Sequence, residues 1–234
     1  MTLEEDNKEA IIETKKREEI LTSWKPKTQL GRDVLSGKIK DIREILDRGI
    51  KIKEPEIVDY LVPNLKAELI LIGGRPGKGG GIERTPVRVT AKMHRSGRRY
   101  RYSAFVVVGN GDGIVGYGKG IGKEGKIAIE KATRKAKLNL IYVPTYCGSW
   151  ECGCGENHSI PYKTEGKSGS VRVILLPAPK GIGLAVSIEN RKLLSLAGVS
   201  DLWIKTFGNS AARYNLVKAT FNALKNLHRF KSGD

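Results

Sequence analysis

The chain has 234 residues, of which 39% are hydrophobic, enough for one large domain or two modest domains with a buried core. Its 42 lysines and arginines outnumber 25 aspartates and glutamates, which gives a formal net charge of +17. Such a charge argues against an ordinary cytosolic enzyme and predicts a polyanionic partner, nucleic acid ahead of a membrane surface. Lysines spread over every face for solubility are the alternative, but they would not group arginines at loop tips.

The apolar residues of the chain form no run long enough for a membrane span. No eighteen consecutive residues are apolar, and the first residues are acidic and polar rather than basic and then apolar. We therefore expect neither a membrane span nor a secretion signal, and a soluble, cytoplasmic protein.

The first part of the chain predicts helices. Residues 1–20 carry seven acidic and four basic side chains, which indicates a helical or partly disordered arm. Ser36 precedes a helix-spaced apolar set that ends at Gly49, so a short amphipathic helix is expected between them. Pro55 stands at a favourable first position for a further helix.

Residues 87–108 predict a β-hairpin with one apolar and one cationic face. The outgoing strand alternates an apolar set with a basic set, which are Val87, Val89, Ala91 and Met93 against Arg88, Lys92 and His94. Arg95–Arg98 turns the chain. The returning strand is expected to bury Tyr102, Ala104, Val106 and Val108.

Two glycine-rich segments, Gly73–Gly81 and Gly120–Gly125, invite comparison with phosphate-binding loops. The first lacks the Walker spacing, because glycine follows Lys78 where serine or threonine is needed. The second matches GxGxxG, but no acid lies about twenty residues further on, as a dinucleotide site requires. We interpret the first as an irregular loop, and the second as a loop whose glycines let a sugar-phosphate backbone approach Lys119 and Lys123.

A basic helix is predicted after the second glycine segment. Its apolar stripe is Ala128, Ile129, Ala132, Ala136 and Leu140, and its basic residues are Lys126, Lys131, Arg134, Lys135 and Lys137. Each lysine alone is explained as a solvated surface charge, whereas their grouping on one helix favours RNA. With the helix at Pro55, the order is helix, three antiparallel strands, helix, as in double-stranded-RNA-binding domains.

The last third of the chain predicts a second α+β domain. Its expected elements are a strand over Ser170–Leu176, an extended segment over Leu184–Ser187, a helix over Glu189–Ala197 stopped by Gly198, and a strand over Asp201–Phe207. Asn209 is predicted to cap a final helix. That helix turns Leu216, Val217, Thr220, Leu224 and Leu227 inward.

Several strings together resemble the universal small-subunit ribosomal protein family usually called S five. They are SGRRYRYSAFVVVGNGDGIVGYGKG, KSGSVRVILLPAPKGIGL, LAGVSDLWIKTFGN and NLVKATFNALKNL. The resemblance runs in order over residues 55–228 and is closest to the archaeal and eukaryotic branch. It implies an α+β fold: a double-stranded-RNA-binding-like domain (αβββα), then a C-terminal α+β domain with a left-handed βαβ crossover. The domain limits predicted with it are 1–54 for an N-terminal helical extension, 55–144, 145–169 for a linker with a cysteine insert, and 170–234.

The resemblance also implies a function. It predicts a structural constituent of the small ribosomal subunit, without catalysis, that binds ribosomal RNA where messenger RNA enters and where body and head meet. The implied neighbours are proteins of the S four and S three families and messenger RNA, with no membrane. The implied role is support of decoding accuracy.

Residues are carried over from the family at two places. Its RNA-contacting hairpin loop falls on His94, Arg95, Ser96, Gly97, Arg98, Arg99 and Tyr100, where arginine forks suit phosphate oxygens. Its contact with the S four protein maps to Pro177, Lys180, Gly181 and Gly183. The predicted RNA-binding set adds basic residues from the rest of the chain, which are Arg75, Lys78, Arg88, Lys92, Arg101, Lys119, Lys123, Lys126, Arg134 and Lys135.

Three cysteines and a histidine lie close together, at Cys147, Cys152, Cys154 and His158. Three sulfurs and one imidazole suit tetrahedral zinc, although only Gly153 separates the second and third cysteines, unlike a standard finger. The alternative is a surface loop with reduced thiols. We predict a structural zinc clip and no organic cofactor.

Two rival functions stay open. The Pro177–Gly183 segment resembles the phosphate loop of small-molecule kinases of the galactokinase, homoserine kinase and mevalonate kinase group. That loop normally continues with two serines, whereas Leu184 and Ala185 follow here. A free RNA-binding regulator is the second rival.

Overall fold

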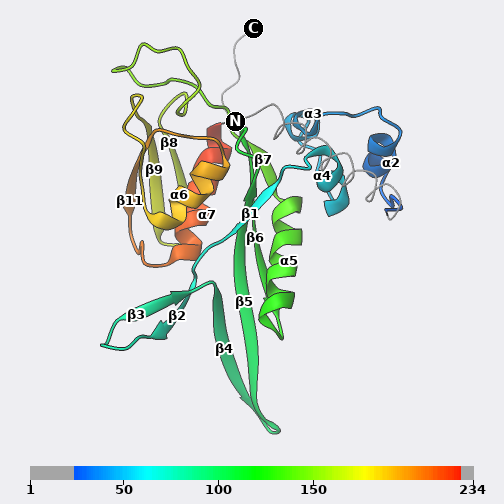
Figure 1. The fold of residues 1–234 in the computed structure, drawn as a ribbon, viewed down its shortest axis with the longest axis vertical. Coiled ribbons are helices and arrows are strands. Elements are labelled where there is room, and N and C mark those ends of the chain that lie inside the picture. Colours follow the sequence, from blue (N-terminus) through cyan, green and yellow to red (C-terminus); the bar gives the residue numbers. More distant parts are fainter. Residues whose placement is uncertain (1–23, 228–234) are drawn as a thin grey trace, which may run out of the picture. The chain divides into compact units, whose positions relative to one another are not determined.

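The computed structural model describes residues 24–227 (Figure 1). The arm predicted over residues 1–20 lies outside them. The chain divides into two compact units, residues 1–65 and residues 66–234. Within residues 24–227, every helix is too short or too polar to cross a membrane.

In the described part of the first unit, residues 24–65, the chain forms three short helices: α2 (Gln29–Leu35), α3 (Ile42–Asp47) and α4 (Pro55–Leu61). Their apolar residues surround a small core that includes Trp24, Val34, Ile45, Ile57 and Val58. Pro55 opens α4 as predicted.

The helix expected between Ser36 and Gly49 is shorter than predicted. Ser36 ends α2 instead of starting a helix, and Gly37, at φ +75°, turns the chain away from it. The next helix begins only after Asp41.

Glu54, just before α4, joins that helix to the segment that precedes α2. Its carboxylate accepts hydrogen bonds from the indole of Trp24 at 2.9 Å and from the backbone N–H groups of Lys27 at 3.0 Å and Thr28 at 2.6 Å. Burial alone would raise the pKa of Glu54, but these hydrogen bonds together hold it below its ordinary value.

A five-stranded sheet begins the second unit. Its path is β1 (Lys66–Leu69), β5 (Gly97–Gly109), β6 (Ile114–Gly122) and β7 (Leu140–Tyr142), and β4 (Val87–His94) also pairs with β5. All these pairings are antiparallel. Helix α5 (Gly125–Leu138) packs along β5 and β6 (Figure 1).

The long strand β5 changes character along its length. Residues 104–108 are buried on both faces of the sheet, which alternation alone did not predict. The predicted apolar face of β4 is exposed instead, because β4 pairs with the half of β5 that extends past the packed part of the sheet. Val89 is 44% exposed and Met93 is 77% exposed.

The first glycine segment is more regular than predicted. Gly73–Pro76 forms β2, which pairs with β3 (Ile82–Thr85) as a separate two-stranded hairpin. Only its tip remains irregular, with Gly79 and Gly80 at positive φ. The expectation of an irregular loop over Gly73–Gly81 is therefore wrong for its first residues.

A four-stranded sheet ends the second unit, in the order β10 (Leu184–Ala185), β11 (Leu202–Phe207), β9 (Val171–Pro177), β8 (Thr164–Ser168). Helix α6 (Ile188–Leu196) connects the parallel pair β10 and β11, and α7 (Arg213–Asn226) follows. The observed architecture confirms the predicted α+β class.

The cap of the last helix differs from the prediction. Ala212, not Asn209, is the N-cap of α7 and makes no side-chain capping bond. The five residues predicted to face inward are all buried.

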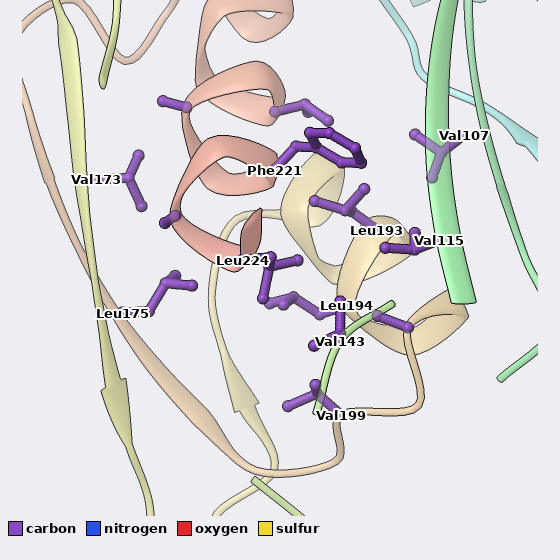
Figure 2. Packing of buried hydrophobic residues seen from close by; sticks show 14 of the residues in the cluster. Val107, Val115, Val143, Val173, Leu175, Leu193, Leu194, Val199, Phe221 and Leu224 are labelled. Atoms are coloured by element: carbon purple, nitrogen blue, oxygen red, sulfur yellow. The ribbon is translucent and has the colours of Figure 1, made fainter. Parts of the chain in front are cut away.

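One hydrophobic core joins the two sheets of the second unit. Val107 and Val115 of the first sheet lie in the same cluster as Leu193 of α6, Phe221 of α7 and Val173 of the second sheet (Figure 2). The domain limits at 1–54, 55–144, 145–169 and 170–234 remain predictions.

Candidate nucleic-acid interface and metal centre

The paired strands β4 and β5 form an arm, defined here as residues 87–103. In Figure 1 it extends beyond the rest of the sheet as a two-stranded ribbon. Register pairs Lys92 with Arg99 and Thr90 with Arg101 across the two strands. Directly opposed residues in an antiparallel pair point to the same face.

The arm therefore has two exposed faces of different chemistry. One face, the cationic face, carries Arg88, Lys92, His94, Arg99 and Arg101, and all five are exposed. The other face carries the exposed apolar residues Val89 and Met93 with Tyr100, which is 49% exposed, and one cation, Arg98, opposite Met93. The predicted division into two faces is present, but neither face is buried within the described part of the chain.

The tip of the arm is held by local contacts. Gly97 has φ +104°, a conformation that glycine adopts readily. Arg99 donates to the Ser96 hydroxyl at 2.8 Å, and the Arg98 guanidinium lies 5.2 Å from the ring centre of Tyr100. These contacts hold the side chains of Arg98 and Arg99 in place before an anion binds to them.

Lys123 lies next to the arm, and together they line a hollow in the surface. The hollow is lined by His94, Ser96, Arg99, Tyr100, Arg101, Tyr102 and Lys123. Six of these seven lining residues belong to the predicted RNA-binding set, and the structure adds Tyr102.

The glycines of β6 serve packing. A Cβ atom added at Gly116, Gly118 or Gly120 would lie 2.5, 2.1 or 2.0 Å from a backbone carbonyl oxygen of α5, and no real Cβ approaches so closely. The prediction that Gly120 and Gly122 admit a sugar-phosphate backbone is therefore wrong, because α5 already occupies that side.

Helix α5 presents its basic side chains outward. Ala128, Ala132 and Ala136 are buried against the sheet, as predicted. Lys126, Arg134 and Lys135 are exposed, with Lys131 beside them. Lys119 lies on the opposite side of β6, where its ammonium is 4.8 Å from the ring centre of Tyr214.

The β2–β3 hairpin carries two further predicted residues, Arg75 and Lys78. Both are exposed. Arg84 of β3, which the predicted set left out, is exposed as well. It pairs with Gly74 across the hairpin, and this register, which the sequence did not predict, places it beside Arg75.

The cysteine insert closes on itself as a cluster. Tyr146 and Ser159 exchange two backbone hydrogen bonds, of 2.8 and 3.1 Å, which bring the ends of the insert together. The sulfur atoms of Cys147, Cys152 and Cys154 and a ring nitrogen of His158 then lie within 4.8 Å of one another. Tetrahedral zinc holds such atoms about 3.6–3.8 Å apart, so a small contraction completes the site.

The thiols of the cluster differ in acidity. The pKa of Cys152 is lowered to about 6, because the backbone N–H groups of Lys180 and Cys154 donate to its sulfur. Partial burial and contacts with the other two thiols raise the pKa of Cys147. A thiolate at neutral pH is the form that binds a metal ion.

The predicted protein-contact residues lie on one loop, defined here as the 177–183 loop. The backbone N–H groups of Gly181 and Gly183 donate to Oδ1 of Asp201 at 3.1 and 2.7 Å. Because these groups are used inside the protein, the loop does not offer the free amides of a kinase phosphate loop. Asp201 has no sequence signal linking it to His158, since three strands and a helix separate the two residues.

Comparison with known proteins decides the family. Residues 86–144 match the family described as "Ribosomal protein S5, N-terminal domain", and residues 166–233 match "Ribosomal protein S5, C-terminal domain". The chain belongs to the ribosomal protein S5 family. The resemblance expected from the arm, the basic helix and the C-terminal strings is thereby confirmed.

Archaeal members of the S5 family align with most of the chain. "Small ribosomal subunit protein uS5" of Methanococcus maripaludis strain C6 is 48% identical over 94% of this chain and 90% of its own length. Proteins of the same name from Methanocaldococcus jannaschii and Aeropyrum pernix are 49% and 50% identical, over 89% and 90% of this chain and 89% of each relative. The family is one of structural ribosomal proteins, in agreement with the expectation of no enzymatic activity.

Proposed function

We propose that the chain is a structural constituent of the small ribosomal subunit in the cytoplasm and binds ribosomal RNA through its arm. The observation that carries the proposal is an arm exposed on both faces, with five basic side chains on one of them. Family membership supports the same role, because the relatives are small-subunit proteins by name. Co-sedimentation with the small subunit in high salt tests membership of the particle.

Phosphate contacts account for most of the binding in this proposal. Arg99 and Arg101 present forked donors that suit phosphate oxygens, and Lys123 adds charge at the same hollow. Met93 and Tyr100 on the other face offer apolar surface to bases or sugars. The β2–β3 hairpin and the outer side of α5 extend the basic surface.

The remaining partners follow from the family resemblance. We place ribosomal proteins of the S four and S three families beside the chain, with the 177–183 loop as a contact, messenger RNA nearby, and support of decoding accuracy as the consequence. The exposure of Lys180 and Gly181 supports this loop as a contact surface.

Replacing Arg99 and Arg101 with alanine tests the arm. Each lost phosphate contact lowers the slope of log affinity against log salt by about 0.9, so the double variant should lose about two units of slope and bind more weakly. Filter binding to small-subunit RNA across a salt series measures it. The matched control replaces Arg172 and Arg191, two exposed arginines of the second sheet and α6, with the same loss of charge.

The control variant should keep the slope of the unmodified protein. An unchanged slope in the Arg99 and Arg101 variant, or an equal fall in both variants, would contradict the arm as the docking element.

We also propose that the cysteine insert holds a structural zinc ion through Cys147, Cys152, Cys154 and His158. The convergence of the four ligand atoms within 4.8 Å supports it. When bound, the ion would cross-link the insert and so stabilise a segment that is too short to form an apolar core of its own.

Metal analysis of protein purified without chelators tests the zinc clip. One zinc per chain is expected, and loss of most of it when Cys152 and Cys154 are both replaced by serine. The control replaces Trp150, an exposed residue of the same insert, with alanine, which leaves the donor set intact. A zinc content near zero in the unmodified protein ends the proposal.

A further inference from the structure

The metal cluster and the 177–183 loop are directly connected. The Lys180 ammonium lies 2.5 Å from the carboxylate of Glu156, which stands between Cys154 and His158 in the insert. The backbone N–H of Ala178 donates to the Ser159 hydroxyl at 3.3 Å. The insert therefore supports the loop along its length.

Asp201 makes the second connection, and it is buried, with 4% of its surface exposed. Its Oδ2 lies 3.0 Å from Nδ1 of His158, while its Oδ1 accepts the backbone N–H groups of Gly181 and Gly183. The backbone N–H groups of Ser200 and Asp201 donate to the carbonyl oxygen of His158 at 2.9 and 3.0 Å. One carboxylate thus contacts both a metal ligand and the loop.

The two sides of the His158 ring have different roles. Its Nε2 lies 3.8 Å from the sulfur of Cys152, on the side of the cluster. Its Nδ1 faces Asp201, although the ring N–H is not aligned well enough for a regular hydrogen bond. A carboxylate at Nδ1 keeps the proton there, leaves Nε2 free to bind a metal ion, and strengthens the imidazole as a ligand.

We propose that Asp201 is a positioning residue that couples metal occupancy of the cysteine insert to the conformation of the 177–183 loop. The inference rests on the proposed zinc clip and goes beyond it. A bound ion fixes His158, His158 fixes Asp201, and Asp201 fixes the amides of Gly181 and Gly183, both of which have positive φ. The coupling is reciprocal, so a restraint on the loop also tightens metal binding.

The test uses the full chain with zinc as the only added ligand. Amide hydrogen exchange is followed by NMR with and without zinc, and zinc affinity is measured against a competing chelator. In the unmodified protein, zinc should slow exchange of the Gly181 and Gly183 amides by about tenfold or more. Amides of α7, in the middle of the core, should not change and report that the fold is intact.

Two variants separate positioning from simple support. Asp201→Asn keeps the shape and an oxygen for the loop amides but removes the charge beside His158, so zinc affinity should fall about 10–100-fold. Glu165→Gln removes only the exposed ion pair with Arg172, between β8 and β9, which carry no ligand of the cluster, and its zinc affinity should stay within about twofold of the unmodified value.

The outcomes distinguish this inference from the zinc clip itself. Zinc bound at one per chain with unchanged exchange at Gly181 and Gly183, or with full affinity in Asp201→Asn, would overturn the coupling and leave the clip standing. An unmodified protein that binds no zinc would remove the clip, and the coupling with it.

Discussion

At the scale of single residues, the sequence predicted some roles correctly and others not. The four metal-ligand candidates were predicted from residue type and spacing, and the structure brings their donor atoms together. Asp201 could not be predicted, because its contact with His158 depends on how β11 follows α6. The Asn209 cap was predicted from residue preference, but the chain makes one more turn and starts α7 after Ala212.

Glu54 offers a test at the residue scale. Glu54→Gln removes a charged acceptor from three donors, so the first unit should lose about 1–3 kcal/mol of its free energy of unfolding at neutral pH. Urea unfolding followed at the Trp24 indole resonance measures it. The exposed Asp47→Asn variant is the control and should change stability by less than about 0.5 kcal/mol.

The effect of Glu54 has a defined pH dependence. Its folded-state pKa lies below the unfolded value of 4.5, so its stabilisation is present above pH 4.5 and is lost as the pH falls through the folded pKa. The difference between the parent and Glu54→Gln should therefore shrink in acid. A difference that stays constant or grows below pH 4.5 would contradict the role of the carboxylate.

Elements with a regular apolar period were predicted well. Helices α5 and α6 and strands β4, β9 and β11 lie where alternation or helical spacing placed them. Strand β8 was missed because its sequence, TEGKS, has no apolar side chain, and it joins the core through Gly166, where an added Cβ would lie 2.2 Å from the carbonyl oxygen of Ala219. Close packing of one backbone on another leaves no pattern of apolar residues in the sequence from which the strand could be predicted.

The β6–α5 contact gives a test at the element scale. Gly118→Ala places a methyl group 2.1 Å from the carbonyl oxygen of Ala132, so the strand and helix must separate, at a cost of about 1–3 kcal/mol in the free energy of unfolding. Denaturant unfolding measures this loss.

Gly125→Ala is the matched control for Gly118→Ala. Gly125 opens α5 and has no heavy atom within 4 Å of an added Cβ, so the same methyl group should be neutral or stabilising by up to about 1 kcal/mol. Equal losses in the two variants would contradict close packing as the reason for glycine in β6.

Across the whole molecule, the positive charge is concentrated on particular surfaces and is not spread evenly. The net charge of +17 predicts a polyanionic partner, and the structure assigns basic side chains to the arm, the β2–β3 hairpin and the outer side of α5. By contrast, residues 145–162, which hold the cysteine insert, contain two glutamates and no lysine or arginine. The α+β class and the family were predictable from the sequence, whereas the exposure of both arm faces was not, because alternation cannot tell a buried apolar face from one that awaits a partner.

RNA cross-linking in assembled small subunits, with both partners mapped, tests the central claim most directly. The account predicts cross-links from the arm, above all from Arg95–Arg101, together with cross-links from the β2–β3 hairpin. An arm that forms no cross-link, while those found lie only on the second sheet, would contradict it.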